Sequence, residues 1–273
     1  MSGKLYIVAT PIGNLEDMTA RGVRTLREAD RIACEDTRHT RHLLDHYGIE
    51  RPLVSFHDHN ERERTEELLA RMREGANIAL VSDAGTPLIS DPGYRMVEAA
   101  VREGIPVIPI PGPSAVITAL AASGLTTDSF YFGGFLPPKQ GQRRRALEAA
   151  GELECVLIFY EAPHRLLESL EDVEVTLPGR TVVIARELTK MHEEFVRGTP
   201  AEVLASFRKR ESVKGEITML ISKPPERGPE TAPVPEVFAR HLKLGLSRMD
   251  AMKATARDCG LSKREVYAEL EKR

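Results

Sequence analysis

This 273-residue sequence contains no tryptophan, and only 5% of its residues are aromatic. Its three cysteines, Cys34, Cys155 and Cys259, are far apart and form no C-x-x-C pair. An odd and scattered set argues against a disulfide framework and a structural zinc site, and it favours a reducing compartment. The chain also opens without a basic and then apolar leader, so we expect a cytoplasmic protein.

Uninterrupted hydrophobic runs are also missing. The one long apolar tract, residues 105–124, contains four prolines. Because prolines break a membrane-spanning helix, this tract argues against a membrane span. The net charge of −3 conceals local charge asymmetry, so it does not exclude an anionic partner.

Motifs for nucleotide phosphates and for metals are absent as well. There is no G-x-x-x-x-G-K-[ST] and no G-x-G-x-x-G after a strand, so neither a nucleoside triphosphate nor a dinucleotide is indicated. The histidines lack the spacing of metal ligands, and His57 and His59 flank Asp58 in what we interpret as a polar loop. We expect no metal site, and no nucleophilic triad is apparent.

Short apolar runs alternate with longer helical stretches along most of the chain. With 41% apolar residues, the chain can bury a substantial core and is expected to form two main units. In residues 1–123 the alternation predicts a mostly parallel sheet with helices on both faces, including a helix at Glu63–Arg73. The predicted strands are Leu5–Ala9, Arg31–Cys34, Leu53–Ser55, Ile78–Val81 and Val107–Ile110.

In residues 124–222, short apolar runs again alternate with helical stretches, but their residues differ from those of the first half. This pattern predicts a second α/β domain that includes antiparallel strand pairs. Its predicted strands are Phe130–Phe132, Val156–Tyr160, Thr181–Arg186, Glu194–Arg197 and Glu216–Ser222. Its predicted helices are Arg143–Ala150, His164–Leu170 and Ala201–Lys209. Residues 223–235 then contain five prolines, which favour an extended linker.

Residues 236–273 predict a small helical module. Two helical stretches, Met249–Ala256 and Lys263–Leu270, flank a glycine-containing turn, and Ser262 is placed to cap the second helix. This helix-turn-helix outline favours nucleic-acid contact through Lys263 and Arg264, although many such units only pack against other helices.

Loops of small residues, acids and prolines follow several predicted strands. Residues 82–91 follow the fourth strand and carry Asp83 and Asp91. Because ligands bind at the carboxyl ends of strands in open α/β sheets, such loops predict one composite site. Their Gly-Pro turns suit an adenine edge, a ribose or an amino-acid tail better than a pyrophosphate. Similar loops follow Leu5–Ala9, Val107–Ile110 and Val156–Tyr160.

Two charged segments are further candidates for function. Residues 34–41 place two acids and two arginines in one strand-to-helix turn, which is more charge than helix capping requires. A basic stretch after the aromatic residues 131–135 favours a phosphate-backbone contact, with a solvated helix start as the alternative. Its cations are Lys139, Arg143, Arg144 and Arg145.

Five motifs occur in order along the chain, at residues 10–14, 34–38, 81–87, 110–115 and 159–165. Together they closely resemble those of the bacterial small-subunit (16S) ribosomal RNA cytidine 2′-O-methyltransferases, a family of the tetrapyrrole-methylase fold class. The resemblance covers almost the whole chain. It implies two α/β domains of the class III methyltransferase type with a small C-terminal helical module. Ser82-Asp83-Ala84 stands where the wider superfamily has Gly-Asp-Pro, and this departure matches the RNA-methylating branch.

The resemblance implies a cleft between the domains that binds S-adenosylmethionine, a 16S ribosomal RNA or small-subunit substrate, and a homodimer. The strand at residues 215–218 is expected to close the donor pocket. The implied donor-site residues are Pro11, Ile12, Asp83, Ala84, Gly85, Thr86, Pro87, Ile89, Ser114, Ala115, Tyr160, Glu161, Ala162, Gly215 and Glu216.

The implied reaction is attack of a ribose 2′-hydroxyl on a sulfonium methyl. The protein must chiefly align the two groups and help to remove the hydroxyl proton. Candidates for the proton acceptor are Glu35, Asp36, Asp91 and His164, and the sequence does not choose among them. Arg38 and Arg165 are candidates to hold flanking phosphates, and His164 is a further candidate for RNA contact.

Two alternative functions stay open at this point. A methylase of the same fold acting on a corrin-like macrocycle would not need the C-terminal module. A non-enzymatic RNA-binding protein would explain the basic stretch and the module, but it would leave the strand-end loops unexplained.

Overall fold

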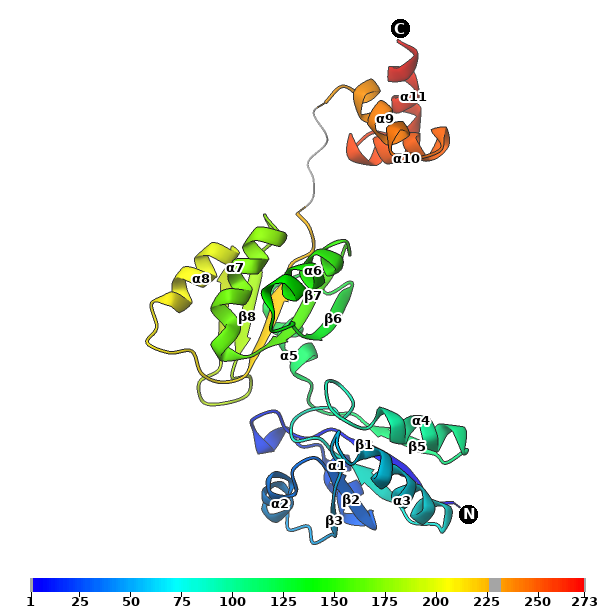
Figure 1. Ribbon diagram of the computed structural model, residues 1–273, viewed down its shortest axis with the longest axis vertical. Coiled ribbons are helices and arrows are strands. Elements are labelled where there is room, and N and C mark those ends of the chain that lie inside the picture. The colour runs from blue at the N-terminus through cyan, green and yellow to red at the C-terminus, as the bar shows by residue number, and fades with distance from the viewer. Residues whose placement is uncertain (1, 226–231, 273) are drawn as a thin grey trace. The chain divides into compact units, whose positions relative to one another are not determined.

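A computed structural model describes residues 2–225 and 232–272 of the chain (Figure 1). The chain divides into two compact units, residues 1–223 and 224–273. Part of the predicted linker, residues 226–231, lies outside the described residues.

The first half of the larger unit is built on a five-stranded parallel sheet with the strand order β3-β2-β4-β1-β5. All five predicted strands are confirmed, with ends that differ by at most one residue. Because the strands are parallel, the loops that follow them lie along one edge of the sheet. The strands are β1 (Leu5–Val8), β2 (Arg31–Cys34), β3 (Leu53–Ser55), β4 (Ile78–Leu80) and β5 (Val107–Ile110).

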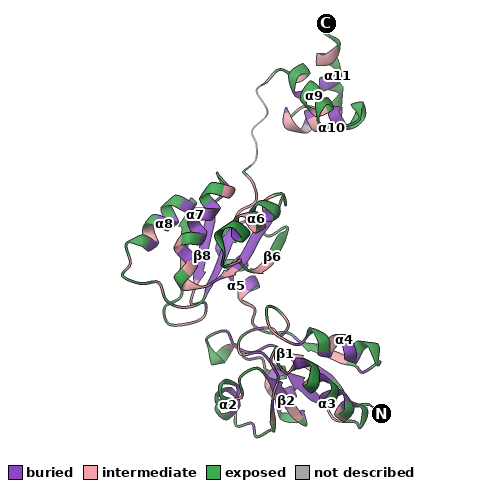
Figure 2. Cartoon of the chain, viewed as in Figure 1, coloured by how far each residue is buried: buried purple, intermediate pink, exposed green. Residues whose placement is uncertain are grey.

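Helices cover both faces of this sheet, which explains why its strands read as continuous apolar runs. Helices α1 (Ala20–Glu28) and α2 (Thr37–His46) pack on one face. A short 3-10 helix, Leu15–Asp17, precedes α1 in the chain. Helices α3 (Glu61–Arg73) and α4 (Tyr94–Arg102) pack on the other. Figure 2 shows the resulting burial along the strands.

The second half of the larger unit contains a mixed sheet with the strand order β6-β7-β10-β8-β9. Strands β6 and β7 are parallel, and the other three pairs are antiparallel, as predicted. The strands are β6 (Phe130–Phe135), β7 (Val156–Glu161), β8 (Val182–Arg186), β9 (Glu194–Gly198) and β10 (Ile217–Ile221).

One face of the second sheet is covered by α6 (Gln140–Gly151), α7 (Leu166–Thr176) and α8 (Pro200–Arg208). A 3-10 helix, Pro163–Arg165, precedes α7, so the predicted helix begins in this tighter geometry and runs further than expected.

The opposite face of the second sheet is covered by α5 (Ala115–Ser123), whose Val116, Ala119 and Leu120 pack against it. The boundary expected after residue 123 therefore differs from the structure, because α5 shares a core with the second sheet. The proline-rich tract 105–124 forms β5, a loop and α5. Among the residues that the structure describes, no helix combines the length and the hydrophobicity needed to cross a membrane.

The smaller unit contains three helices within its described residues, α9 (Val234–Lys243), α10 (Arg248–Asp258) and α11 (Lys263–Glu271). The two predicted helices are confirmed, and Ser262 caps α11 in a capping box with Glu265. Helix α9 was not predicted, and it begins inside the segment expected to be the linker. Buried Val237, Ala251 and Val266 give this unit a small apolar core of its own.

Candidate functional site

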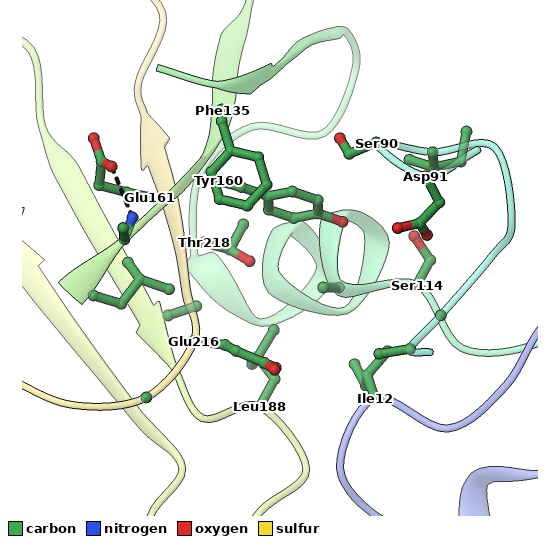
Figure 3. Close-up of a pocket in the computed structure, with 18 of the residues that line it drawn as sticks. Ile12, Ser90, Asp91, Ser114, Phe135, Tyr160, Glu161, Leu188, Glu216 and Thr218 are labelled. Atoms are coloured by element: carbon green, nitrogen blue, oxygen red, sulfur yellow. Dashed lines mark hydrogen bonds between the residues drawn. The ribbon is translucent and has the colours of Figure 1, made fainter. Parts of the chain in front are cut away.

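A pocket of about 410 Å³ lies in the larger unit (Figure 3). Loops that follow β1, β4 and β5 line one side of it, and the end of β7, the end of β8 and the start of β10 line the other. All the donor-site residues predicted from the resemblance line it, except Pro11 and Pro87. Asp91, predicted as a catalytic residue, lines it too. The structure thus brings residues from distant parts of the sequence into one cavity.

Hydrogen bonds hold three of these loops together. Thr10 and Gly85 exchange backbone hydrogen bonds of 2.8 and 3.1 Å. The Thr10 hydroxyl donates to the Ser82 carbonyl at 3.1 Å, and the Thr86 hydroxyl donates to the Pro113 carbonyl at 3.2 Å. Side chains that bind backbone carbonyls in this way fix the floor of the pocket before any ligand is present.

The loop between β4 and α4 carries backbone strain. Leu88 and Ser90 adopt φ angles of 74° and 70°, which non-glycine residues rarely do. Each such residue costs roughly 1–3 kcal/mol, and such strain clusters at functional sites. The buried carboxylate of Glu61 accepts hydrogen bonds from the backbone N–H groups of Gly93 and Arg95, so α3 anchors the far end of this loop.

Carboxylates gather where β2 and β4 end. The Asp83 carboxylate accepts a hydrogen bond of 3.1 Å from the backbone N–H of Asp36. Burial and the neighbouring Glu35 carboxylate raise the pKa of Asp91 to about 6. Burial and Asp83 likewise raise the pKa of Glu35 above its ordinary value. Asp91 is therefore mostly a carboxylate at neutral pH and takes up a proton as the pH falls through about 6.

Tyr160 crosses the pocket from the second sheet. In Figure 3 its hydroxyl is turned toward Asp91. Burial and the carboxylates of Asp91 and Glu216 raise the pKa of Tyr160 to about 12, so the phenol stays protonated at neutral pH. The pocket therefore contains a fixed hydrogen-bond donor beside a carboxyl group that titrates.

Glu161 lines the pocket, but its carboxylate is bound inside the protein. It accepts hydrogen bonds from the Ala162 backbone N–H at 2.7 Å and from the Ser169 hydroxyl. It also pairs with the guanidinium of Arg165 at 2.7 Å. Glu161 therefore offers the pocket its backbone, and Arg165 has little free guanidinium surface for a phosphate.

The strand that closes the pocket depends on one glycine. Gly215 has a φ of 91°, and a Cβ atom there would lie 2.5 Å from the side chain of Glu187. The Glu187 carboxylate accepts a 3.0 Å hydrogen bond from the backbone N–H of Glu216, and Lys190 pairs with both acids. These contacts hold β10 against the loop after β8.

Three predicted catalytic residues lie outside this pocket. Asp36 caps α2 by accepting hydrogen bonds from the backbone N–H groups of Arg38 and His39, and the first of these chiefly lowers the pKa of Asp36. Glu35 acts on the pocket through its charge on Asp91. Arg38 lines a second hollow of about 560 Å³, together with Thr37, Arg41, His42 and Leu53.

The prediction that Arg143 contacts RNA is wrong. Its side chain is 1% exposed, and it binds the fully buried carboxylate of Asp172 at 2.6 Å. Arg144 binds the other oxygen of Asp172 at 2.7 Å and is 38% exposed. These arginines join α6 to α7, so the charge of Arg143 faces the protein interior. Lys139 and Arg145 are exposed, as an RNA contact requires.

The predicted donor-site set missed several residues that line the pocket. Ile217 and Thr218 lie in the strand that was expected to close it, and Pro163 follows directly after a predicted residue. Ser90 belongs to the loop of residues 82–91, which was predicted to bind the donor. No sequence motif marks Ala185 and Leu188, which lie at the end of β8 and in the loop after it. Phe135 is the one aromatic residue among those missed, and a local irregularity in β6 places its side chain here.

Within residues 2–225 and 232–272, no three Asp, Glu, His or Cys side chains are grouped closely enough to hold a metal ion.

Comparison with known proteins places the chain in a family. Residues 4–204 match the family of tetrapyrrole (corrin/porphyrin) methylases. The chain is 50% identical over 271 residues to the ribosomal RNA small subunit methyltransferase I of Halalkalibacterium halodurans, covering 97% of this chain and 93% of that protein. It is 54% identical over 222 residues to the protein of the same name from Escherichia coli O157:H7, covering 80% and 77%.

Solved structures with this fold are more distant in sequence. Diphthine synthase aligns with a TM-score of 0.63 and 16% identity, covering 81% of this chain and 90% of that one. The uroporphyrin-III C-methyl transferase from Thermus thermophilus, complexed with S-adenyl homocysteine, aligns with a TM-score of 0.57 and 19% identity, covering 80% and 97%. The chain therefore belongs to the tetrapyrrole methylase family and, within it, to the ribosomal RNA small subunit methyltransferase I family.

Proposed function

We propose that this protein transfers a methyl group from S-adenosylmethionine to the ribose 2′-hydroxyl of a cytidine in 16S ribosomal RNA. The observation that carries the proposal is the pocket, in which strand-end loops of a methyltransferase family converge from both sheets. The relatives are named for methylation of small-subunit ribosomal RNA, and one protein of the same fold holds S-adenyl homocysteine.

The pocket suits a donor of this class. Its volume of about 410 Å³ falls in the range of roughly 300–1,000 Å³ that small-molecule sites occupy. Apolar side chains such as Ile12, Ala115 and Leu188 offer packing for an adenosine, and the Asp83 carboxylate offers an acceptor for an amino or ribose group. When bound, S-adenosylmethionine supplies an electrophilic methyl group.

Asp91 is the proposed proton acceptor. Of the four acceptors considered from the sequence, Asp91 lines the pocket, whereas Glu35, Asp36 and His164 do not. A base whose pKa is near the working pH is well suited to remove a proton in the transition state. The neutral phenol of Tyr160 is placed to donate a hydrogen bond in the same cavity.

The proposed RNA contacts are the basic side chains that the fold leaves exposed. Two residues predicted from the sequence are left out, because Arg143 is buried and Arg165 is paired with Glu161. Contacts to phosphates mainly position the RNA and add salt-dependent affinity. The exposed candidates are Arg38, Lys139, Arg145, His164, Lys263 and Arg264, with Arg144 as a partly exposed member.

Replacing Asp83 with alanine is expected to weaken donor binding by roughly 1–3 kcal/mol, the scale of losing one charged hydrogen-bond partner. Calorimetry with S-adenosylmethionine measures this loss directly. Asp58→Ala is the matched control, because Asp58 is an exposed acid nearby that does not line the pocket. Unchanged donor affinity in a folded Asp83→Ala protein would contradict the assignment.

A chain that ends at Lys223 is expected to bind the donor with unchanged affinity and to methylate the ribosomal substrate poorly when that substrate is limiting. The C-terminal unit has its own buried residues, and a tethered RNA-binding unit raises the effective concentration at the target. Lys263→Ala/Arg264→Ala in the full chain separates loss of charge from loss of the unit. Full activity of the truncated chain at low substrate would show that the unit is dispensable.

Two measurements decide between the proposed function and its alternatives. Donor binding by the purified protein separates an enzyme from a non-enzymatic RNA-binding protein. Mapping of ribose methylation in ribosomal RNA from a deletion strain separates an RNA methyltransferase from a corrin-type methylase.

We further propose a cytoplasmic homodimer, in keeping with the dimers of this superfamily. Light scattering during size-exclusion chromatography gives the oligomeric state.

A further inference from the structure

Phe135 has an environment that the donor site does not explain. It lines the pocket, yet the residue is 57% exposed. Figure 3 shows its ring beside that of Tyr160. The two ring centroids are 5.5 Å apart in an edge-on arrangement. A large apolar ring half open to solvent at the mouth of a cavity is a candidate ligand contact.

An irregularity in β6 turns Phe135 toward the pocket. Phe132 pairs with Ile158 and Phe135 pairs with Tyr160, so three steps along β6 match two along β7. In a regular strand, residues three apart point to opposite faces. Here the rings of Phe132 and Phe135 both contact Tyr160, with centroids 4.9 and 5.5 Å away. The extra residue therefore returns Phe135 to the face of Phe132, as β-bulges near active sites commonly do.

Two glycines make this bulge possible. Gly134 adopts a φ of 66°, where a side chain is strained. A Cβ atom on Gly133 would lie 2.3 Å from the ring of Phe159. The sequence Phe-Gly-Gly-Phe thus encodes the bulge and places an aromatic ring at each end of it.

We propose that Phe135 stacks on the nucleobase of the nucleotide whose ribose is methylated, or on the base beside it, and so holds the RNA strand at the pocket. This inference rests on the proposed RNA substrate. Aromatic rings that stack on bases next to backbone-binding cations are typical of single-stranded RNA sites. Lys139 is exposed four residues after Phe135, at the start of α6.

The exposure of Phe135 favours an RNA base over the donor as its partner. Among the large apolar residues that line the pocket, Phe135 is the most exposed, at 57% against 43% for Ile89 in the β4 loop. An RNA strand must approach from the solvent side. The stack would also place the ribose attached to that base near Tyr160 and Asp91, which lie in the same cavity.

Replacing Phe135 with alanine is expected to lower kcat/KM for the ribosomal substrate by about 5- to 150-fold, the scale of one base–aromatic stack. Donor affinity and oligomeric state should be unchanged. Phe135→Tyr should keep most of the activity, because a tyrosine ring stacks equally well. Phe130→Ala is the matched control, since Phe130 is 42% exposed on the same strand and does not line the pocket.

The absence of tryptophan from the chain permits a direct test of contact. Phe135→Trp introduces a single tryptophan, whose fluorescence should be quenched by the small ribosomal subunit and unaffected by the donor alone. Phe130→Trp should show no such quenching.

Three results would overturn the inference. They are an unchanged kcat/KM in Phe135→Ala, equal losses in Phe135→Ala and Phe130→Ala, and a loss of donor affinity or of oligomeric state. If the unmodified protein does not methylate ribosomal RNA, the proposed function itself fails, and this outcome is distinct from all three.

Discussion

Asp91→Asn is expected to lower kcat for ribose methylation by roughly 10²–10⁴-fold, the contribution typical of a positioned general base. Asparagine keeps the shape of the side chain and cannot accept the proton. Donor affinity should be little changed. Stability should be unchanged or higher, because burial disfavours the charged carboxylate that the substitution removes. Steady-state methylation of small ribosomal subunits measures the effect.

The same assignment predicts the pH dependence of the reaction. The pKa of Asp91 is raised to about 6 by burial and by Glu35, so the acid form predominates at lower pH. Because the carboxylate is the base, kcat should fall as the pH decreases through about 6 and level off above it. In Asp91→Asn this inflection should be missing.

Glu35→Gln is the informative control for both results. Glu35 does not line the pocket, but its charge raises the pKa of Asp91. Its removal should move the inflection to lower pH and leave the plateau rate nearly unchanged. If the plateau in Glu35→Gln collapsed and Asp91→Asn stayed active, the proton acceptor would be Glu35.

Asp172→Ala is expected to reduce the free energy of unfolding by roughly 3–5 kcal/mol, the usual cost of leaving one member of a buried ion pair without its partner. Both side chains are buried, with 1% of Arg143 and 0% of Asp172 exposed. Arg143 would keep a 3.2 Å hydrogen bond to the Pro138 carbonyl and a 3.3 Å contact with Glu168. Denaturant-induced unfolding followed by circular dichroism measures the loss.

The neighbouring Glu171 supplies the control for this prediction. Its salt bridge with Arg208 is on the surface, with 46% and 56% of the two side chains exposed. Such pairs contribute about 0–1 kcal/mol, so Glu171→Ala should change stability little. The double variant Arg143→Met/Asp172→Leu should lose less than the sum of its single variants, because it leaves no unpaired charge. Additive losses would mean that the two charges do not interact.

Arg143 must be left unchanged when the RNA role of the basic stretch is tested, because substituting Arg143 would weaken the fold. Lys139→Ala/Arg145→Ala should reduce RNA affinity and flatten its salt dependence by about one unit of slope per lost phosphate contact. Donor affinity should be unchanged. A salt slope equal to that of the unmodified protein would identify these residues as ordinary solvated surface.

Local patterns in the sequence were sufficient for the strands and for the donor loops. Apolar runs such as Leu5–Ala9 and Ile78–Val81 end in loops rich in small residues and proline, and parallel pairing necessarily brings such ends to one edge. Helix α9 was missed because Pro233 and Pro235 read as linker, although proline is well tolerated in the first turn of a helix.

The sequence by itself determined the alternation of strands and helices, the loops of the pocket and the resemblance to a methyltransferase family. These features depend on residues that are close together in the chain. Tertiary structure decided which charges are available. Lys139 and Arg143 belong to one basic stretch, but Arg143 is buried in an ion pair with Asp172 on another helix, whereas Lys139 is exposed. It also placed Asp91 inside the pocket and Glu35 outside, and it turned Phe135 toward Tyr160. Burial and pairing arise from contacts between distant segments, so no local pattern contains them.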